Sequence, residues 1–153
     1  MSDPYLRLLS VDVFAADISY PVAGGNIYFD EYRGIVTGCD ENVTDAYIPA
    51  EINGVIVAEI GNSAFRNCKS LRNVSIPGSV SEIGQSAFED CVSLESIIIP
   101  DSVKKMGRYV FSRCRNLASV KLSNSLSGIP DGTFTNCDKL ENIDIPDCVS
   151  YIG

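Results

Sequence analysis

The chain has 153 residues, 45% of them hydrophobic and 21% charged, which is enough to bury the core of one ordinary domain and argues against disorder. The net charge of −8 argues against nucleic acid and anionic membranes as partners, and no apolar stretch approaches the ~20 residues that a membrane-spanning helix needs. The chain contains no histidine, which excludes Ser/His/Asp and Cys/His catalysis and disfavours zinc and non-haem iron sites. We therefore expect no enzymatic activity, no metal and no cofactor.

The N-terminal segment 1–16 shows no repeat. Its apolar positions fit one face of a short helix, so one interpretation is a capping helix or a disordered arm. The other interpretation is the tail of an export signal, because Val13–Ala16 resembles a cleavage site, although Asp3, Arg7 and Asp12 interrupt the apolar stretch that a signal needs.

Residues 17–44 favour a small β structure. Residues 18–22 and 26–30 alternate around Ala23-Gly24-Gly25, which indicates a hairpin, and residues 34–38 fit a third strand. Because the first coil of a repeat protein must be covered, we assign residues 1–44 as an N-terminal arm and β cap. A repeat domain then follows over residues 45–153.

The main signal is an internal repeat. Cys68, Cys91, Cys114 and Cys137 are evenly spaced, with a period of about 23 residues that lies in the range of known repeat architectures. The same step relates a phenylalanine, a leucine and a β-branched position in each unit, at Phe65, Phe88, Phe111 and Phe134, at Leu71, Leu94, Leu117 and Leu140, and at Val74, Ile97, Val120 and Ile143. The unit reads I-G-x-x-A-F-x-x-C-x-x-L-x-x-V-x-I-P-x-x-V-x-x, and self-similarity at such a period predicts a solenoid.

The chemistry of one unit predicts its local structure. L-x-x-V-x-I ends in period-2 alternation, which indicates a short strand that the following proline stops. The pair Val80 and Ile83 leads into Gly84 as a turn, and the apolar spacing within Gln85–Cys91 favours a single helical turn. We therefore predict a right-handed leucine-rich-repeat solenoid of about five coils, with a parallel sheet on the concave side and helical turns on the convex side.

This unit resembles that of the BspA-like (treponemal-type) leucine-rich-repeat family. The resemblance is strong over residues 48–153 and extends to a lead-in at residues 24–51, and the departures are Ser123 in place of proline and Pro130 in place of glycine. It implies a non-catalytic adhesion module of a secreted or cell-surface bacterial protein that engages proteins or glycans of a host or neighbouring cell. A structural spacer that presents another domain is the alternative.

The sequence stops inside a repeat unit, at Tyr151-Ile152-Gly153. An uncapped coil exposes apolar surface and unpaired strand groups. We expect a fragment of a longer protein, and the alternative is end-to-end self-association through the C-terminal coil.

The cysteines resemble a metal site only at first sight. Stacked coils are one strand spacing apart, so the four repeat sulfurs are spread over ~14 Å and cannot converge on one zinc ion. We expect them to be small buried hydrophobic residues with free thiols. Cys39 and Cys148 lie outside the repeat, and the sequence assigns no pairing to either.

The candidate binding surface is the concave face of the predicted sheet. Residues on either side of the inward Val or Ile point outward, and a solenoid commonly binds ligands there. These residues are Asp45, Tyr47, Asn73, Ser75, Ser96, Ile98, Ser119, Lys121, Asn142 and Asp144. Tyr47, Ile98 and Lys121 are the larger side chains, and a plain solvated sheet face stays an open alternative.

A second candidate is the basic cluster formed by Arg108, Arg113 and Arg115. An acidic or sulfated partner would suit it, but a solvated convex turn is the simpler interpretation.

Overall fold

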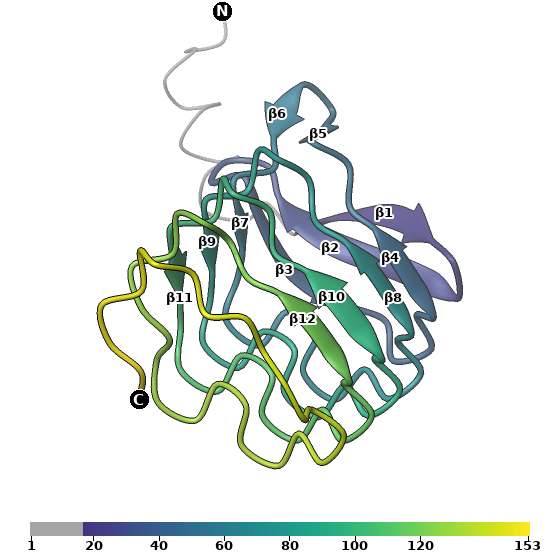
Figure 1. Cartoon of the computed structure of the whole chain (residues 1–153). Coiled ribbons are helices and arrows are strands. Elements are labelled where there is room, and N and C mark those ends of the chain that lie inside the picture. Colours follow the sequence, from purple (N-terminus) through teal and green to yellow (C-terminus); the bar gives the residue numbers. More distant parts are fainter. Residues whose placement is uncertain (1–16) are drawn as a thin grey trace, which may run out of the picture.

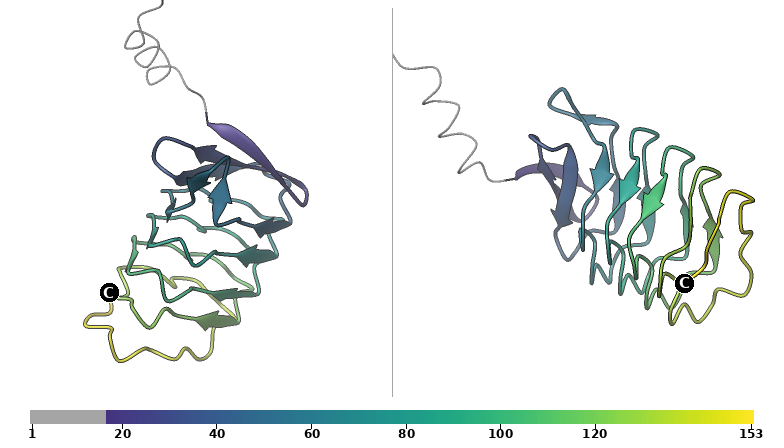
Figure 2. Two further views of the ribbon diagram at one scale, coloured as in Figure 1. Left: turned by 90° about the horizontal axis from the view of Figure 1, so that it is seen from above. Right: turned by 90° about the vertical axis from the view of Figure 1, so that its left-hand side faces the viewer.

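The computed structural model describes residues 17–153, which form twelve strands and no helix (Figure 1). The chain winds into a mostly β solenoid of about four coils, and the coils stack side by side along one axis (Figure 2). The predicted solenoid is confirmed, with about four coils in place of five. The predicted helix or arm at residues 1–16 lies outside the described residues.

The N-terminal strands extend one sheet of the solenoid. They are β1 (Ile18–Val22), β2 (Gly25–Asp30) and β3 (Ile35–Cys39). β1 pairs antiparallel with β2, and β2 pairs antiparallel with β3. β3 then pairs in parallel with β7 (Glu59–Ile60), the first strand of its column. The turn between β1 and β2 requires glycine at Gly24, where φ is 88° and a Cβ would overlap the carbonyl oxygen of Asn42.

One carboxylate fixes the β2–β3 hairpin. Asp40 accepts hydrogen bonds from the Tyr28 hydroxyl at 2.5 Å and from the backbone and side-chain nitrogens of Asn26 at 2.8 and 3.0 Å. The hydrogen bonds from Tyr28 and then Asn26 lower the pKa of Asp40, and the same contact raises the pKa of Tyr28. Three donors on one carboxylate therefore join the start of β2 to the end of β3.

Each coil contributes strands to two columns. The first, here called the ladder column, consists of β4 (Asp45–Tyr47), β8 (Asn73–Ser75), β10 (Ser96–Ile98) and β12 (Ser119–Lys121). The second column consists of β7, β9 (Glu82–Ile83) and β11 (Lys105–Met106), which pair in parallel and continue the β1–β2–β3 sheet. A hairpin of β5 (Glu51–Ile52) and β6 (Val55–Ile56) projects from the first coil (Figure 1).

The second column corrects the prediction of one strand per coil. The Ile83–Gly84 segment was predicted as a turn, yet Glu82 and Ile83 pair with the equivalent residues of the coils before and after. A strand of this length is too short to show period-2 alternation. The strand exists because equivalent residues of neighbouring coils lie next to each other.

The predicted helical turns are wrong. In the segment 85–91, Ser86 and Asp90 have φ values of 56° and 61°, which an α-helix does not permit. The N–H of Phe65 donates to the carbonyl oxygen of Ala87 at 2.8 Å, and that of Phe88 donates to Val110 at 2.9 Å. Because alternate N–H groups bond to the next coil, they are not available for bonds within a helix.

The core is a set of columns that run along the solenoid. The rings of Phe65, Phe88, Phe111 and Phe134 stack with centroids 5.1, 5.6 and 5.8 Å apart and planes within 10° of parallel. The first three rings are fully buried, as are the repeat leucines Leu71, Leu94 and Leu117. One coil cannot bury such side chains alone, so the stack of coils is the folding unit.

The cysteine column ends in a disulfide. The thiols of Cys91, Cys114 and Cys137 each donate to a phenylalanine carbonyl oxygen of the preceding coil at 3.1 Å. Cys68 is instead bonded to Cys39 at the end of β3. The expectation that all four repeat cysteines are free is therefore wrong for Cys68. Cys39 lies where a cysteine of a preceding coil would lie. Its position in the sequence does not follow the 23-residue step, so the repeat pattern did not reveal it.

The last predicted strand does not form. Residues 142–145 follow the path of the ladder column but make no strand pairing with β12. The final residues are joined to the coil before by the bridge from Ile129 to Ile152 and by hydrogen bonds from the N–H and hydroxyl of Ser150 to the carbonyl oxygen of Ser127. Ile145 and Ile152 are exposed at this edge beside the half-buried Phe134.

Candidate functional site

The predicted surface residues lie on the outer side of the ladder column, here called the ladder face. The central residues of its strands, Ala46, Ile97 and Val120, are buried, and Val74 is half-buried. The flanking positions are exposed, apart from the half-buried Asp45. Tyr47 and Ile98 are the most exposed apolar side chains there, each with 64% of its surface accessible.

The N-terminal half of the ladder face is a paired set of four predicted residues. β4 and β8 align Asp45 with Asn73 and Tyr47 with Ser75. The Asn73 amide donates to Asp45 at 2.5 Å, and Arg72 lies 3.9 Å from the same carboxylate. The hydrogen bond from Asn73 is the main cause of the lowered pKa of Asp45. This half therefore presents the Tyr47 ring near the Asp45 carboxylate, which already has Asn73 and Arg72 as partners.

The C-terminal half places Ile98 beside Lys121 and Ser96 beside Ser119, through the pairing of β10 with β12. The two halves are not joined by strand pairing, because among the described residues no backbone hydrogen bond links β8 to β10. A hollow of about 300 Å³ lies between them, lined by both strands and Pro100. The ladder face is therefore two strand pairs with a shallow cleft between Ser75 and Ile98.

Asn142 and Asp144 were predicted to continue this surface. They are exposed but lie in residues without strand pairing, and a hollow of about 450 Å³ separates Asp144 from Ser119 and Lys121. The structure thus brings eight of the ten predicted residues onto paired strands and leaves these two beside them.

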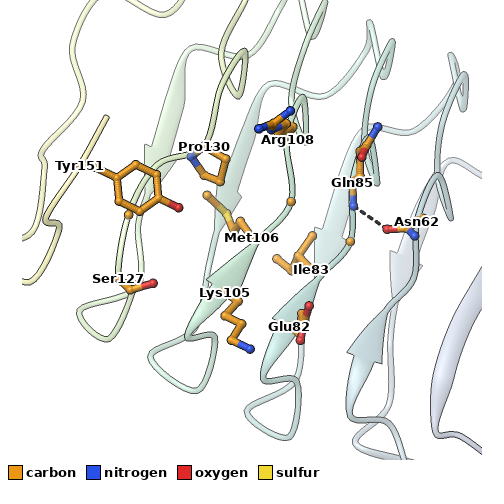
Figure 3. A pocket seen from close by; sticks show the side chains of 13 residues that line it. Asn62, Glu82, Ile83, Gln85, Lys105, Met106, Arg108, Ser127, Pro130 and Tyr151 are labelled. Carbon is orange, nitrogen blue, oxygen red and sulfur yellow. Dashed lines mark hydrogen bonds between the residues drawn. The ribbon is translucent and has the colours of Figure 1, made fainter. Parts of the chain in front are cut away.

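Sequence reasoning missed a groove on the other strand column, here called the glycine groove (Figure 3). Its volume is about 590 Å³, and Gly84 and Gly107 lie along its floor. Glu82, Lys105 and Ser127 line one rim, and Asn62, Gln85 and Arg108 line the other (Figure 3). Tyr151 closes one end.

The repeat itself creates this groove. A Cβ at Gly84 would overlap the backbone nitrogen of Asn62, and a Cβ at Gly107 would overlap that of Gln85. The glycines therefore permit close stacking of coils, and the longer side chains two positions before Gly107 and one position after it form the rims. In the sequence, the rim residues are the variable positions just before and just after each I-G pair. Their role as rims can be recognised only when the second strand column is known.

Comparisons with known proteins settle the family. A family model described as a BspA type leucine rich repeat region matches residues 39–153 in six copies. The chain belongs to the BspA-type leucine-rich-repeat family. This family is generally non-catalytic. No curated protein sequence matches the chain.

Solved structures of bacterial leucine-rich-repeat proteins share the fold. A Treponema pallidum leucine-rich-repeat protein is 24% identical, with 89% of this chain and 82% of that chain covered and a TM-score of 0.65. One from Bacteroides capillosus is 27% identical, with 88% and 87% covered and a TM-score of 0.53. One from Eubacterium ventriosum is 19% identical, with 82% and 46% covered and a TM-score of 0.51.

The basic cluster of this BspA-type chain is largely paired across coils. Arg113 lies 3.4 Å from Asp90 of the preceding coil, and Arg108 lies 3.4 Å from Asp131 of the following coil. Arg115 is exposed and has no ion-pair partner among residues 17–153. The three arginines therefore do not form one free basic surface, and Arg108 belongs instead to the rim of the glycine groove.

The buried thiols have little of the character of a reactive site. Desolvation by burial is the main cause that raises the pKa of Cys114 to about 12, that of Cys137 to about 11 and that of Cys91 well above its usual value. From Asp17 onward, no three His, Cys, Asp or Glu side chains gather in a way that would hold a metal ion. Over the same residues, no helix has the length and apolar character to cross a membrane.

Proposed function

We propose that this chain is a binding module of a secreted or cell-surface protein and that its ligand contacts the ladder face. The observation that supports this is the exposure of Tyr47 and Ile98 on a paired β surface whose other outward residues are small or polar. A tyrosine gives a large contact area at low entropic cost, and few apolar anchors surrounded by polar groups are typical of protein-binding surfaces.

The proposed ligand is a protein or glycan of a host or neighbouring cell. Tyr47 lies beside Ser75, and Ile98 lies beside Lys121, so each apolar side chain has a hydrogen-bonding or charged neighbour. The cleft between β8 and β10 forms a depression in the surface between Tyr47 and Ile98. In the same proposal, the β1–β2 hairpin serves as the N-terminal cap, because it covers the edge from which the parallel sheet begins.

A binding screen with a matched control tests the proposal. The purified chain is measured against extracellular-matrix proteins, mucins and glycans, beside a Tyr47→Ala/Ile98→Ala double variant. Ile56→Ala is the control, because Ile56 is equally exposed but lies on the β5–β6 hairpin. We expect saturable binding that the double variant loses and the control keeps. Equal binding by all three proteins would show that the ligand contacts a surface other than the ladder face, and no binding to any candidate would favour a spacer over a binding module.

A further inference from the structure

The glycine groove contains an opposed pair of cationic side chains in an acidic molecule. Lys105 and Arg108 lie on opposite rims, on the two sides of Gly107 (Figure 3). They belong to the stretch 104–115, which has five Lys or Arg residues and no Asp or Glu, although the whole chain has a net charge of −8. Lys105 and Arg108 thus give the groove two cations against the one carboxylate of Glu82, and a single coil sets the position of both cations.

Both cations are available to a ligand. The ion pair of Arg108 with Asp131 has a separation of 3.4 Å, and both side chains are more than half exposed, so it contributes little and an incoming anion can replace it. Lys105 stands opposite Glu82 in the strand register, but no ion pair is formed by Lys105 among the described residues. A planar guanidinium is suited to bidentate recognition of a carboxylate.

The neutral lining of the groove adds an aromatic surface and amides. The Tyr151 ring is 53% exposed and lies against Gly128, where any Cβ would overlap it. The Asn62 side-chain oxygen accepts the N–H of Gln85 at 2.7 Å, which leaves the amino group of Asn62 and the side-chain amide of Gln85 facing the rim (Figure 3). Such amides bond to hydroxyl groups, and an aromatic face packs against the C–H groups of a sugar ring.

The floor of the groove argues against a peptide ligand. The N–H groups of Gly84 and Gly107 donate to the carbonyl oxygens of Ile60 and Ile83 at 2.7 and 2.8 Å, so they are not free to pair with an added strand. Ile83 is fully buried and Met106 nearly so, so the floor itself offers little apolar surface to peptide side chains. Recognition must come from the rims.

We propose that the glycine groove binds a carboxylated saccharide. The carboxylate lies between Lys105 and Arg108, a sugar ring packs on Tyr151, and the amides of Asn62 and Gln85 bond to hydroxyl groups. Glu82 accepts hydroxyl donors, but its charge repels the carboxylate. This site is separate from the ladder face and does not depend on the function proposed for that face.

Calorimetric titration with two oligosaccharides of equal length tests this proposal. The probes are a hyaluronan hexasaccharide, which contains glucuronate, and the neutral chitin hexasaccharide. We expect saturable binding of the hyaluronan probe that Lys105→Gln, Arg108→Gln or Tyr151→Ala weakens by about tenfold or more. Glu82→Gln is expected to strengthen it, because the substitution removes a like charge.

Lys121→Gln and the Tyr47→Ala/Ile98→Ala variant are the controls, because these residues lie on the ladder face. Both should bind hyaluronan within about twofold of the unmodified chain, and the melting temperatures of all variants should match. Equal affinity for the neutral probe, equal losses in the ladder-face controls, or no saturable hyaluronan binding would each overturn the proposal. If the chain binds hyaluronan but none of the ligands tested for the ladder face, the function proposed above is wrong and the proposal for the glycine groove is supported.

Discussion

The ring of Phe65 lies parallel to that of Phe88, with centroids 5.1 Å apart and planes within 9° of each other. Phe88 has a second ring, Phe111, on its other side. Removal of Phe88 therefore disturbs two neighbouring coils at once, as removal of Phe111 would.

Phe88→Ala is expected to lower the free energy of unfolding by about 3–5 kcal/mol, the usual cost of truncating a buried aromatic side chain. Urea or thermal unfolding measures this loss. Ser75→Ala, on the exposed side of β8, is the matched control and should change stability by less than about 0.5 kcal/mol. A harmless Phe88→Ala would mean that the inward register of the repeat is wrong.

Gly107→Ala is expected to destabilise the fold by about 1–3 kcal/mol, because the added Cβ overlaps the backbone of Gln85 and forces two coils apart. Gly78→Ala offers a control in another coil, because no atom lies within 4 Å of a Cβ at that position. We expect Gly78→Ala to be neutral or slightly stabilising in the same unfolding experiment. Equal effects of the two substitutions would contradict the close approach at Gly107.

The Asp40 network makes stability depend on pH. Its hydrogen bonds hold the pKa of Asp40 below the value in the unfolded chain. The resulting stability is present above the unfolded pKa of about 4 and is lost as the pH falls through the lower folded pKa. Asp40→Asn should therefore reduce the melting temperature at pH 7 and make the melting temperature less sensitive to acid.

Glu41→Gln is the control for Asp40→Asn, because it removes a neighbouring exposed carboxylate without touching Tyr28 or Asn26. Thermal unfolding between pH 7 and pH 3 distinguishes the two variants. If both changed the pH profile alike, the specific hydrogen bonds to Asp40 would not be the cause.

The cysteines should differ in reactivity. In the native protein at pH 8, iodoacetamide is expected to modify the exposed Cys148 first, while the buried thiols of Cys91 and Cys114 react only on unfolding, because their raised pKa values keep them protonated. Cys39 and Cys68 should become reactive only after reduction. Mass spectrometry of digested samples identifies each modified residue.

Loss of the disulfide is expected to cost about 2–4 kcal/mol, the usual range for a bond that restrains the unfolded chain. Cys39→Ser measures this loss under oxidising conditions, with Cys148→Ser as the control. A Cys39→Ser protein as stable as the unmodified chain would show that the hairpin docks on the first coil without the covalent link.

The sequence was sufficient to predict the ladder strands and the buried columns, because the alternation around Val74, Ile97 and Val120 repeats in every unit. It was not sufficient for β9, since a strand as short as Glu82–Ile83 has no detectable period of its own. Nor did it indicate the left-handed residues Ser86 and Asp90, which are not glycines and whose conformation depends on bonds to the next coil. The Cys39–Cys68 pair was missed because only the fold brings β3 against the first coil.

The glycine groove was missed because, like the disulfide, it exists only once the fold brings different segments together. The outward positions at Tyr47 and Ile98 follow from strand alternation alone. The rims of the glycine groove follow from the stacking of Gly84 and Gly107, which brings equivalent side chains of successive coils into one row. A single unit read in isolation contains neither the floor nor the opposite rim.

The hydrogen bonds that join residues 63–67, 86–90 and 109–113 to the following coil all have the same direction. In each coil, alternate N–H groups donate to carbonyl oxygens of the following coil, as the bonds of Ser63, Phe65 and Asn67 to Gln85, Ala87 and Glu89 illustrate. In this segment each coil therefore presents N–H donors to the following coil and carbonyl acceptors to the preceding one, so the row of hydrogen bonds has one direction along the stack, like the bonds of a head-to-tail polymer.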